Sequence, residues 1–98
     1  MPRGLRDRAS VLRACAEYDR LGQERFLSEH GFGPATKYLL RLGGKSYDSK
    51  AIVGVAYGIE NPGEGTLPAG AFSGGVSHGA AAWQLQRLGF EVVERGAH

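Results

Sequence analysis

Two short segments of the chain place hydroxyl groups where helices are expected to begin. The first is the Tyr-Asp-Ser-Lys sequence of residues 47–50, and the second is the Phe-Ser-Gly-Gly sequence of residues 72–75. The first turn of a helix has backbone N–H groups without intrahelical partners and carries partial positive charge, so it attracts anions. Because no catalytic constellation accompanies them, the two segments favour binding of a phosphate backbone over a chemical reaction.

Lys50 carries the most informative charge of the first segment. A lysine in the first turn of a helix opposes the helix dipole at a cost of roughly 0.3–1 kcal/mol, and an anion bound at the same end would reverse that penalty. The Ser49 hydroxyl could donate a hydrogen bond to the same phosphate, and we expect Lys45 to add positive charge to the site. A lysine that points into water explains the pattern equally well.

The second segment predicts a further anion site. Ser73, Gly74 or Gly75 is expected to begin the last helix, and two glycines let backbone N–H groups converge on an anion. His78 then falls in the first turn of that helix and resembles a weaker copy of the lysine in the first segment.

Two aromatic residues have alternative interpretations. Tyr47 could stack on a base or contact a sugar, as aromatic residues do in nucleic-acid sites. It could equally be a core residue of a strand, and the core interpretation is favoured. Trp83 adjoins an apolar stripe and is expected in the core.

The sequence contains no motif for catalysis or for metal binding. The GxxxxGK[ST] phosphate loop of nucleotide hydrolases is absent. The three histidines, His30, His78 and His98, do not have the spacing of metal ligands. The single cysteine, Cys15, excludes an intrachain disulfide and a multi-thiolate zinc site. We therefore expect no catalytic residue, no metal and no cofactor, and a protein that is not an enzyme.

Composition is typical of one soluble globular domain, with 98 residues, 42% hydrophobic and 22% charged. No apolar run approaches the roughly 20 residues that span a bilayer. The basic start of the chain leads into no apolar signal segment, so we expect a cytoplasmic protein without a membrane partner. A net charge of +2 supports nucleic-acid binding only weakly. Three arginines near the N-terminus are expected to form a mobile basic arm: Arg3, Arg6 and Arg8.

Hydrophobic periodicity and turn residues predict four helices and three strands. The helices are expected at residues 8–21, 23–30, 50–57 and from 73–75 to 88, and the strands at residues 37–42, 45–48 and 90–93. The sum is an α+β domain, in which three to four helices pack on one face of a small, mostly antiparallel three-stranded sheet. We expect a single domain over residues 1–98, with the arm at 1–7, the globular part at 8–94 and a frayed tail at 95–98.

The order of these segments is similar to a known module. The likeness lies in YDRLG at residues 18–22, GFG at 31–33, GKSYDSKAI at 44–52, FSGG at 72–75 and LGFEV at 88–92. Over about residues 8–93 the chain resembles the N-terminal head domain of McrA-type, modification-dependent restriction endonucleases. In that family the domain precedes sulfur-binding, methylcytosine-binding and HNH nuclease domains. The resemblance implies a DNA-associated module of a bacterial defence system, but not DNA cleavage, because the HNH and zinc residues are absent here.

The leading hypothesis is therefore a non-catalytic domain that holds the phosphates of double-stranded DNA through Lys45, Ser49, Lys50 and the 73–75 segment. In a sharper variant, Tyr47 or another aromatic residue senses a modified base such as methylcytosine. The alternative is a protein–protein module that docks on the other domains of the endonuclease or self-associates. It is suggested by the low net charge and by the glycine-rich, apolar helix at residues 51–58.

Overall fold

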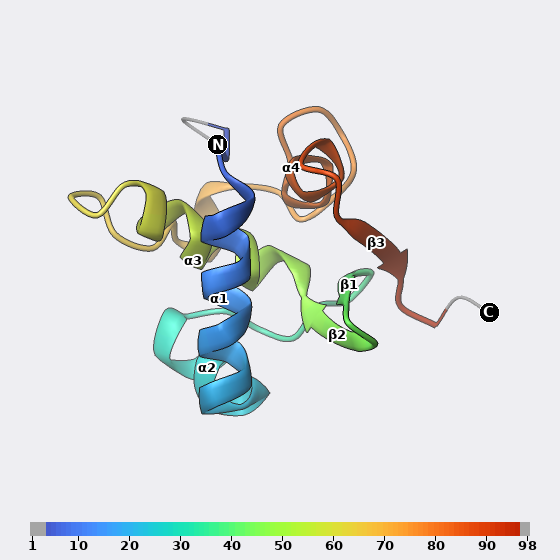
Figure 1. The fold of residues 1–98 in the computed structure, drawn as a ribbon, viewed down its shortest axis with the longest axis horizontal. Helices are drawn as coiled ribbons and strands as arrows, with labels where there is room; N and C mark the ends of the chain where they lie inside the picture. The colour runs from blue at the N-terminus through green and yellow to red at the C-terminus, as the bar shows by residue number, and fades with distance from the viewer. Residues whose placement is uncertain (1–3, 97–98) are drawn as a thin grey trace.

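The computed structural model describes residues 4–96. Its helices are α1 (Arg8–Leu21), α2 (Gln23–His30), α3 (Ser49–Glu60), the 3-10 turn η1 (Ala69–Ala71) and α4 (Ala81–Arg87). Its strands are β1 (Tyr38–Leu42), β2 (Lys45–Asp48) and β3 (Glu91–Glu94). The predicted small α+β fold is confirmed, and α1, α2 and β2 have the predicted bounds. In Figure 1 the strands lie on one side of the molecule, with α1, α2 and α3 on the other and α4 above the sheet.

The sheet has the order β2-β1-β3, and both pairings are antiparallel. Leu40, at its centre, lies opposite Tyr47 on one side and Val92 on the other. The β1–β2 connection is a two-residue hairpin, in which Gly43 and Gly44 have φ of 59° and 78°. Two positive φ values in a two-residue hairpin are strongly unfavourable for most residues other than glycine, asparagine and aspartate. The hairpin fixes the register that carries β2 directly into α3.

Helix α3 is the centre of the hydrophobic core. Every residue from 51 to 57 is buried, and α3 contacts α1, α4 and the sheet. A Cβ added at Gly54 would lie 2.5 Å from the Phe32 ring, and one at Gly58 would lie 2.6 Å from the Thr66 backbone nitrogen. The absence of a side chain at these two glycines therefore lets the domain's own loops pack directly against α3. The predicted use of this helix as a contact surface for a partner is wrong, because the chain itself covers it.

The segment before α1 is part of the fold. Leu5 is 1% exposed, and its N–H donates to Gln84 Oε1 over 3.1 Å. The Arg6 N–H donates to Glu60 Oε1 over 2.8 Å, and the Arg6 guanidinium donates to the Glu60 carbonyl over 2.9 Å. The prediction of a mobile arm is therefore wrong for residues 4–7. Arg3 lies outside the described residues.

Arg8 and Arg95, which were predicted to lie in mobile ends of the chain, also have structural roles. The Arg8 guanidinium donates to the Leu88 carbonyl over 2.5 Å and lies 4.0 Å from the centroid of the Phe90 ring. The Arg95 N–H donates to the Lys37 carbonyl over 2.6 Å. The predicted fraying at residue 95 is wrong, because this bond extends the contact between β3 and β1 past the end of the strand.

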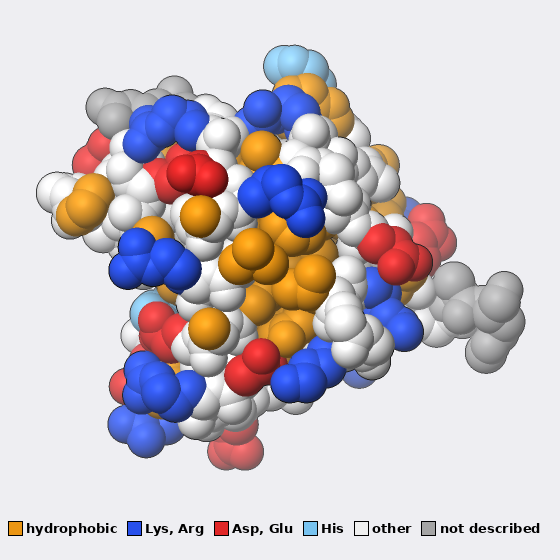
Figure 2. All heavy atoms as spheres, in the orientation of Figure 1, with side chains coloured by type: hydrophobic (Ala, Val, Ile, Leu, Met, Phe, Trp, Pro, Cys, Tyr) orange, Lys and Arg blue, Asp and Glu red, His pale blue; other side chains and the backbone are white. Residues whose placement is uncertain are grey.

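The surface mixes charges of both signs. Figure 2 shows lysine, arginine and acidic side chains distributed over the visible face, with hydrophobic side chains gathered beside α1. Of the helices in residues 4–96, none is both long and apolar enough to cross a membrane.

Candidate phosphate-binding cleft

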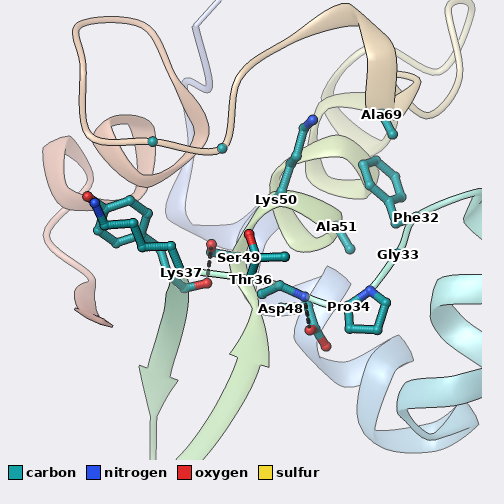
Figure 3. Close-up of a pocket in the computed structure, with 14 residues that line it drawn as sticks. Phe32, Gly33, Pro34, Thr36, Lys37, Asp48, Ser49, Lys50, Ala51 and Ala69 are labelled. Atoms are coloured by element: carbon teal, nitrogen blue, oxygen red, sulfur yellow. Dashed lines mark hydrogen bonds between the residues drawn. The ribbon is translucent and has the colours of Figure 1, made fainter. Parts of the chain in front are cut away.

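A hollow of about 440 Å³ opens at the beginning of α3. Three segments that lie far apart in the sequence form its walls, as the close-up in Figure 3 shows. They are residues 32–38, which join α2 to β1, residues 48–51, and a third wall made by Ala69, Gly74 and Gly75. We call this hollow the α3 cleft.

Asp48 precedes α3 but does not cap it through its side chain. Its carboxylate accepts hydrogen bonds from the Tyr18 hydroxyl over 2.6 Å, from Gln23 Nε2 over 3.0 Å and from the Ala35 N–H over 2.7 Å. The residue is 2% exposed. One buried carboxylate thus joins α1, α2 and the loop that forms a wall of the cleft. Burial and the hydrogen bond to Asp48 raise the pKa of Tyr18.

Ser49, the first residue of α3, also turns its side chain away from the helix end. Its hydroxyl donates to the Tyr38 carbonyl over 2.8 Å, and the residue is 2% exposed. The predicted donation of this proton to a phosphate does not fit, because the proton already has an acceptor. Since Asp48 and Ser49 are both engaged elsewhere, neither satisfies the N–H groups of the first turn of α3, which lie at the cleft.

Two lysines flank the α3 cleft in Figure 3. Lys50 runs along Gly74, where an added Cβ would lie 3.5 Å from Lys50 Cδ, and its Nζ is 5.1 Å from the centroid of the Phe72 ring. Lys37 Nζ is 5.4 Å from the Tyr38 ring centroid. Neither lysine forms an ion pair with an acidic residue in the part of the chain that the structure describes. Lys37 was not among the predicted site residues, although it belongs to a basic run in the sequence.

Lys45 and Tyr47 both contact Asp19 and do not line the α3 cleft. Lys45 Nζ lies 3.5 Å from Asp19 Oδ1, which offsets its charge. Tyr47 is 3% exposed, and its hydroxyl donates to the Asp19 carboxylate over 3.0 Å. Burial is the largest cause that raises the pKa of Tyr47 to about 12, and this hydrogen bond is the second. The core interpretation of Tyr47 is confirmed, so the variant in which its ring stacks on a base does not fit the structure.

The second predicted helix end is not where the sequence placed it. Helix α4 begins at Ala81, and residues 72–80 form a loop. The Ala81 N–H donates to the Ser73 carbonyl over 2.8 Å, and the Trp83 N–H donates to the Gly75 carbonyl over 3.3 Å. Neither Gly74 nor Gly75 has the positive φ that an alternating anion nest requires. The predicted helix start at residues 73–75 is therefore wrong, although both glycines line the α3 cleft.

His78 is correspondingly not in a helix. It is exposed in the loop, and its ring centroid lies 4.3 Å from that of Trp83. Trp83 is partly exposed rather than fully in the core. Sequence periodicity placed Trp83 beside the apolar stripe but gave no sign that a loop histidine would cover its ring.

The comparisons with known proteins fit this architecture. A model of the ScoMcrA-like, N-terminal head domain family matches residues 6–94. The chain belongs to this family. A solved structure described as the type IV phosphorothioation-dependent restriction endonuclease ScoMcrA matches with 38% sequence identity and a TM-score of 0.63. The match covers 94% of this chain and 13% of that chain, so this head domain spans a small part of its relative. No curated protein matches. The predicted family is confirmed.

Proposed function

We propose that this head domain is a non-catalytic DNA-binding module that holds a phosphate of double-stranded DNA in the α3 cleft. The observation that carries the proposal is the beginning of α3, which is left uncapped by Asp48 and Ser49 and is flanked by Lys37 and Lys50. Membership in a restriction endonuclease family supports DNA as the polyanion. A cytoplasmic location belongs to the same proposal, because restriction acts on DNA inside the cell.

The electrostatics favour one phosphate over neutral ligands. The beginning of a helix carries roughly half a positive charge, which adds to the charge of the two lysines. An anion there would also relieve the conflict between Lys50 and the helix dipole. The Asp48 carboxylate opposes this attraction, but it is 2% exposed and accepts three hydrogen bonds. The cleft therefore retains a positive balance.

Contacts of this kind position a protein on DNA without reading its sequence. The relative is named for its dependence on phosphorothioation, and the sequence suggested a sensor for a modified base. With Tyr47 buried, we expect the α3 cleft to bind methylated and unmodified duplexes of one sequence with equal affinity. A phosphorothioate duplex is the informative third probe, because its modification lies on the group that the cleft would hold.

The test is a fluorescence anisotropy titration of labelled duplex and single-stranded DNA with the 98-residue chain, repeated between about 50 and 200 mM salt. The logarithm of the affinity should fall with the logarithm of salt with a slope of about −0.9 for each phosphate contact. Lys50→Ala and Lys37→Ala should each weaken binding and make the slope shallower.

Lys45→Ala is the matched control. It removes the same side chain and the same charge from a lysine that is paired with Asp19, so its effect should be clearly smaller than that of Lys50→Ala. Binding that does not change with salt would remove the proposal. So would equal losses from Lys45→Ala and Lys50→Ala, because they would place the DNA away from the cleft.

A second candidate function is docking on the other domains of the endonuclease. Figure 2 shows hydrophobic side chains gathered beside α1 on an otherwise polar face, and the matched relative is much longer than this chain. Light scattering over a concentration series measures self-association, and titration with the remaining domains of the relative measures docking. A chain that stays monomeric and does not bind those domains would reject this candidate, and the proposal of DNA binding would be unaffected.

A further inference from the structure

The loop between η1 and α4 has a fixed shape and presents an exposed tip. Its base is held by the hydrogen bond from Ala81 to Ser73 and by one from the Gly75 N–H to Ser73 Oγ over 3.3 Å. Nearer the tip, the Ala80 N–H donates to the Ser77 carbonyl over 2.9 Å. The tip consists of Val76, Ser77 and His78, which are all exposed.

Val76 is unusual among the apolar residues of this protein. It is 44% exposed, and Leu12 on α1 is the other large hydrophobic residue with this exposure in residues 4–96. An apolar side chain held out by a fixed loop gains free energy when a ligand removes it from water. The loop is therefore suited to contact with a partner surface.

His78 is supported from below by Trp83. The two rings meet with a centroid distance of 4.3 Å and an interplanar angle of 50°, and the Arg87 guanidinium lies 5.5 Å from the Trp83 ring centroid. In Figure 1 the loop before α4 lies at the top of the view, above that helix. His78 is exposed, and its ring forms no hydrogen bond with another group of residues 4–96. Trp83 thus holds the histidine ring outward at the tip.

The tip adjoins the α3 cleft. Gly75 lines the cleft and accepts the hydrogen bond from Trp83, and Val76 follows it directly. An extended chain advances by at most about 3.6 Å per residue, so His78 lies within about 11 Å of Gly75. A duplex has its grooves immediately beside each phosphate, and the minor groove is about 6 Å wide. A duplex whose phosphate occupies the cleft therefore brings a groove within reach of the tip.

We propose that the tip formed by residues 76–78 enters a DNA groove next to the phosphate in the α3 cleft, with Val76 as an apolar wedge and His78 as a polar contact. Apolar side chains that pack against base steps in the minor groove are an established mode of architectural DNA binding. Trp83 is a positioning residue in this arrangement. The inference rests on the proposed function and adds a groove contact to a phosphate contact.

The experiment uses Trp83 as a reporter, because it is the single tryptophan of the chain. Duplex DNA should change the Trp83 emission at the concentrations at which anisotropy reports binding. Val76→Ser should weaken binding by about fivefold, which corresponds to loss of a partly buried apolar side chain. The salt slope should stay unchanged, because a groove contact releases no counterion. His78→Gln should likewise weaken binding without changing the slope.

Leu12→Ser is the matched control, since Leu12 has the same exposed fraction as Val76 but lies on α1. It should leave DNA affinity unchanged, and thermal unfolding should show that both variants are folded. Anisotropy that shows binding, together with unchanged Trp83 emission and a Val76→Ser variant that binds like the parent, would overturn this inference alone. A slope that becomes shallower in His78→Gln would also overturn it, because the tip would then contact a phosphate. Absence of any DNA binding by the parent chain would instead reject the proposed function.

Discussion

At the beginning of α3 the residues that usually cap a helix turn their side chains away, whereas at the beginning of α4 the preceding loop turns its own carbonyl groups onto the helix. Asp48 binds three donors from other segments, and Ser49 donates to β1. By contrast, the carbonyl groups of Ser73 and Gly75 accept from the first N–H groups of α4. The first turn of α3 therefore has no side-chain cap, whereas the N–H groups of Ala81 and Trp83 at the beginning of α4 have carbonyl acceptors.

The difference shows that residue type alone does not reveal what a helix end binds. An aspartate and a serine before a helix usually provide caps, but here Asp48 instead accepts from the buried Tyr18 hydroxyl and from the part-buried donors of Gln23 and Ala35. A buried donor without a partner costs about 1–3 kcal/mol, which favours an acceptor for the Tyr18 hydroxyl over a side-chain cap on α3. Tertiary demand therefore overrides local capping preference.

Asp48→Ala tests this view of α3 and should have the largest effect on stability. It removes the acceptor of the buried Tyr18 hydroxyl and of two part-buried donors, so the free energy of unfolding should fall by about 3 kcal/mol. Denaturant titration measures the loss. Asp48→Asn keeps an acceptor for the Ala35 N–H and should cost less than the alanine variant. A fall below about 1 kcal/mol in Asp48→Ala would contradict the role of this carboxylate as the hub of the α3 end.

Ser73→Ala is the corresponding change at α4. The Ser73 hydroxyl accepts only the Gly75 N–H in the described part of the chain, and the residue is exposed. The bond that reaches α4 comes from its backbone carbonyl, which alanine keeps. Stability should therefore change by less than about 0.5 kcal/mol. A loss as large as that of Asp48→Ala would remove the distinction between the two helix ends.

Tyr47→Phe tests the α3 side of the comparison, where Tyr18 and Tyr47 donate hydrogen bonds to aspartates. The substitution removes the hydrogen bond to Asp19 and should cost about 1 kcal/mol at neutral pH. Burial raises the pKa of Tyr47 from 10 to about 12 and that of Cys15 from 9 to about 12. Burial also raises the pKa of Tyr18.

These shifts make stability depend on alkaline pH. The folded state holds each proton more tightly than the unfolded chain does, so their contribution is fully present below the unfolded pKa values. It is lost as pH rises from about 9–10 through about 12. Tyr47→Phe removes one of these protons, so the decline of the free energy of unfolding between pH 10 and 12 should be shallower. Equal alkaline slopes in the parent and the variant would show that Tyr47 is not buried as described.

The sequence predicts those parts of the fold that local chemistry decides. Helix α1 begins after Asp7, an N-cap residue whose side chain accepts from the Ala9 N–H. Gly22 and Gly31 delimit α2, because both have positive φ. The two-glycine turn sets the register of β1 and β2. Each of these signals acts within a few residues, so a single sequence is enough to find it.

The candidate site was predicted only in part, because its walls come from three distant segments. Lys50 and the two glycines of residues 74 and 75 were chosen from local patterns and do meet at one cleft. Lys37 was missed because its place opposite Lys50 depends on how the 32–38 loop is held by Asp48. Lys45 was chosen on charge, and only the packing of β2 against α1 reveals its pairing with Asp19.

Gly74→Ala and Gly75→Ala should stabilise the protein slightly, and they test whether α4 is satisfied by backbone groups alone. Neither glycine has positive φ. An added Cβ would lie 3.5 Å from Lys50 Cδ at Gly74 and 3.7 Å from Ser73 Oγ at Gly75, which are ordinary contacts. The free energy of unfolding of each variant should therefore rise by about 0.4–1 kcal/mol, because alanine lowers the entropy of the unfolded chain. Gly79→Ala is the contrasting variant, since its φ of 86° strains any other side chain and should make it unstable. If Gly75→Ala were as damaging as Gly79→Ala, the loop would need glycine conformations at residue 75, and the carbonyl contacts that close α4 would not explain its difference from α3.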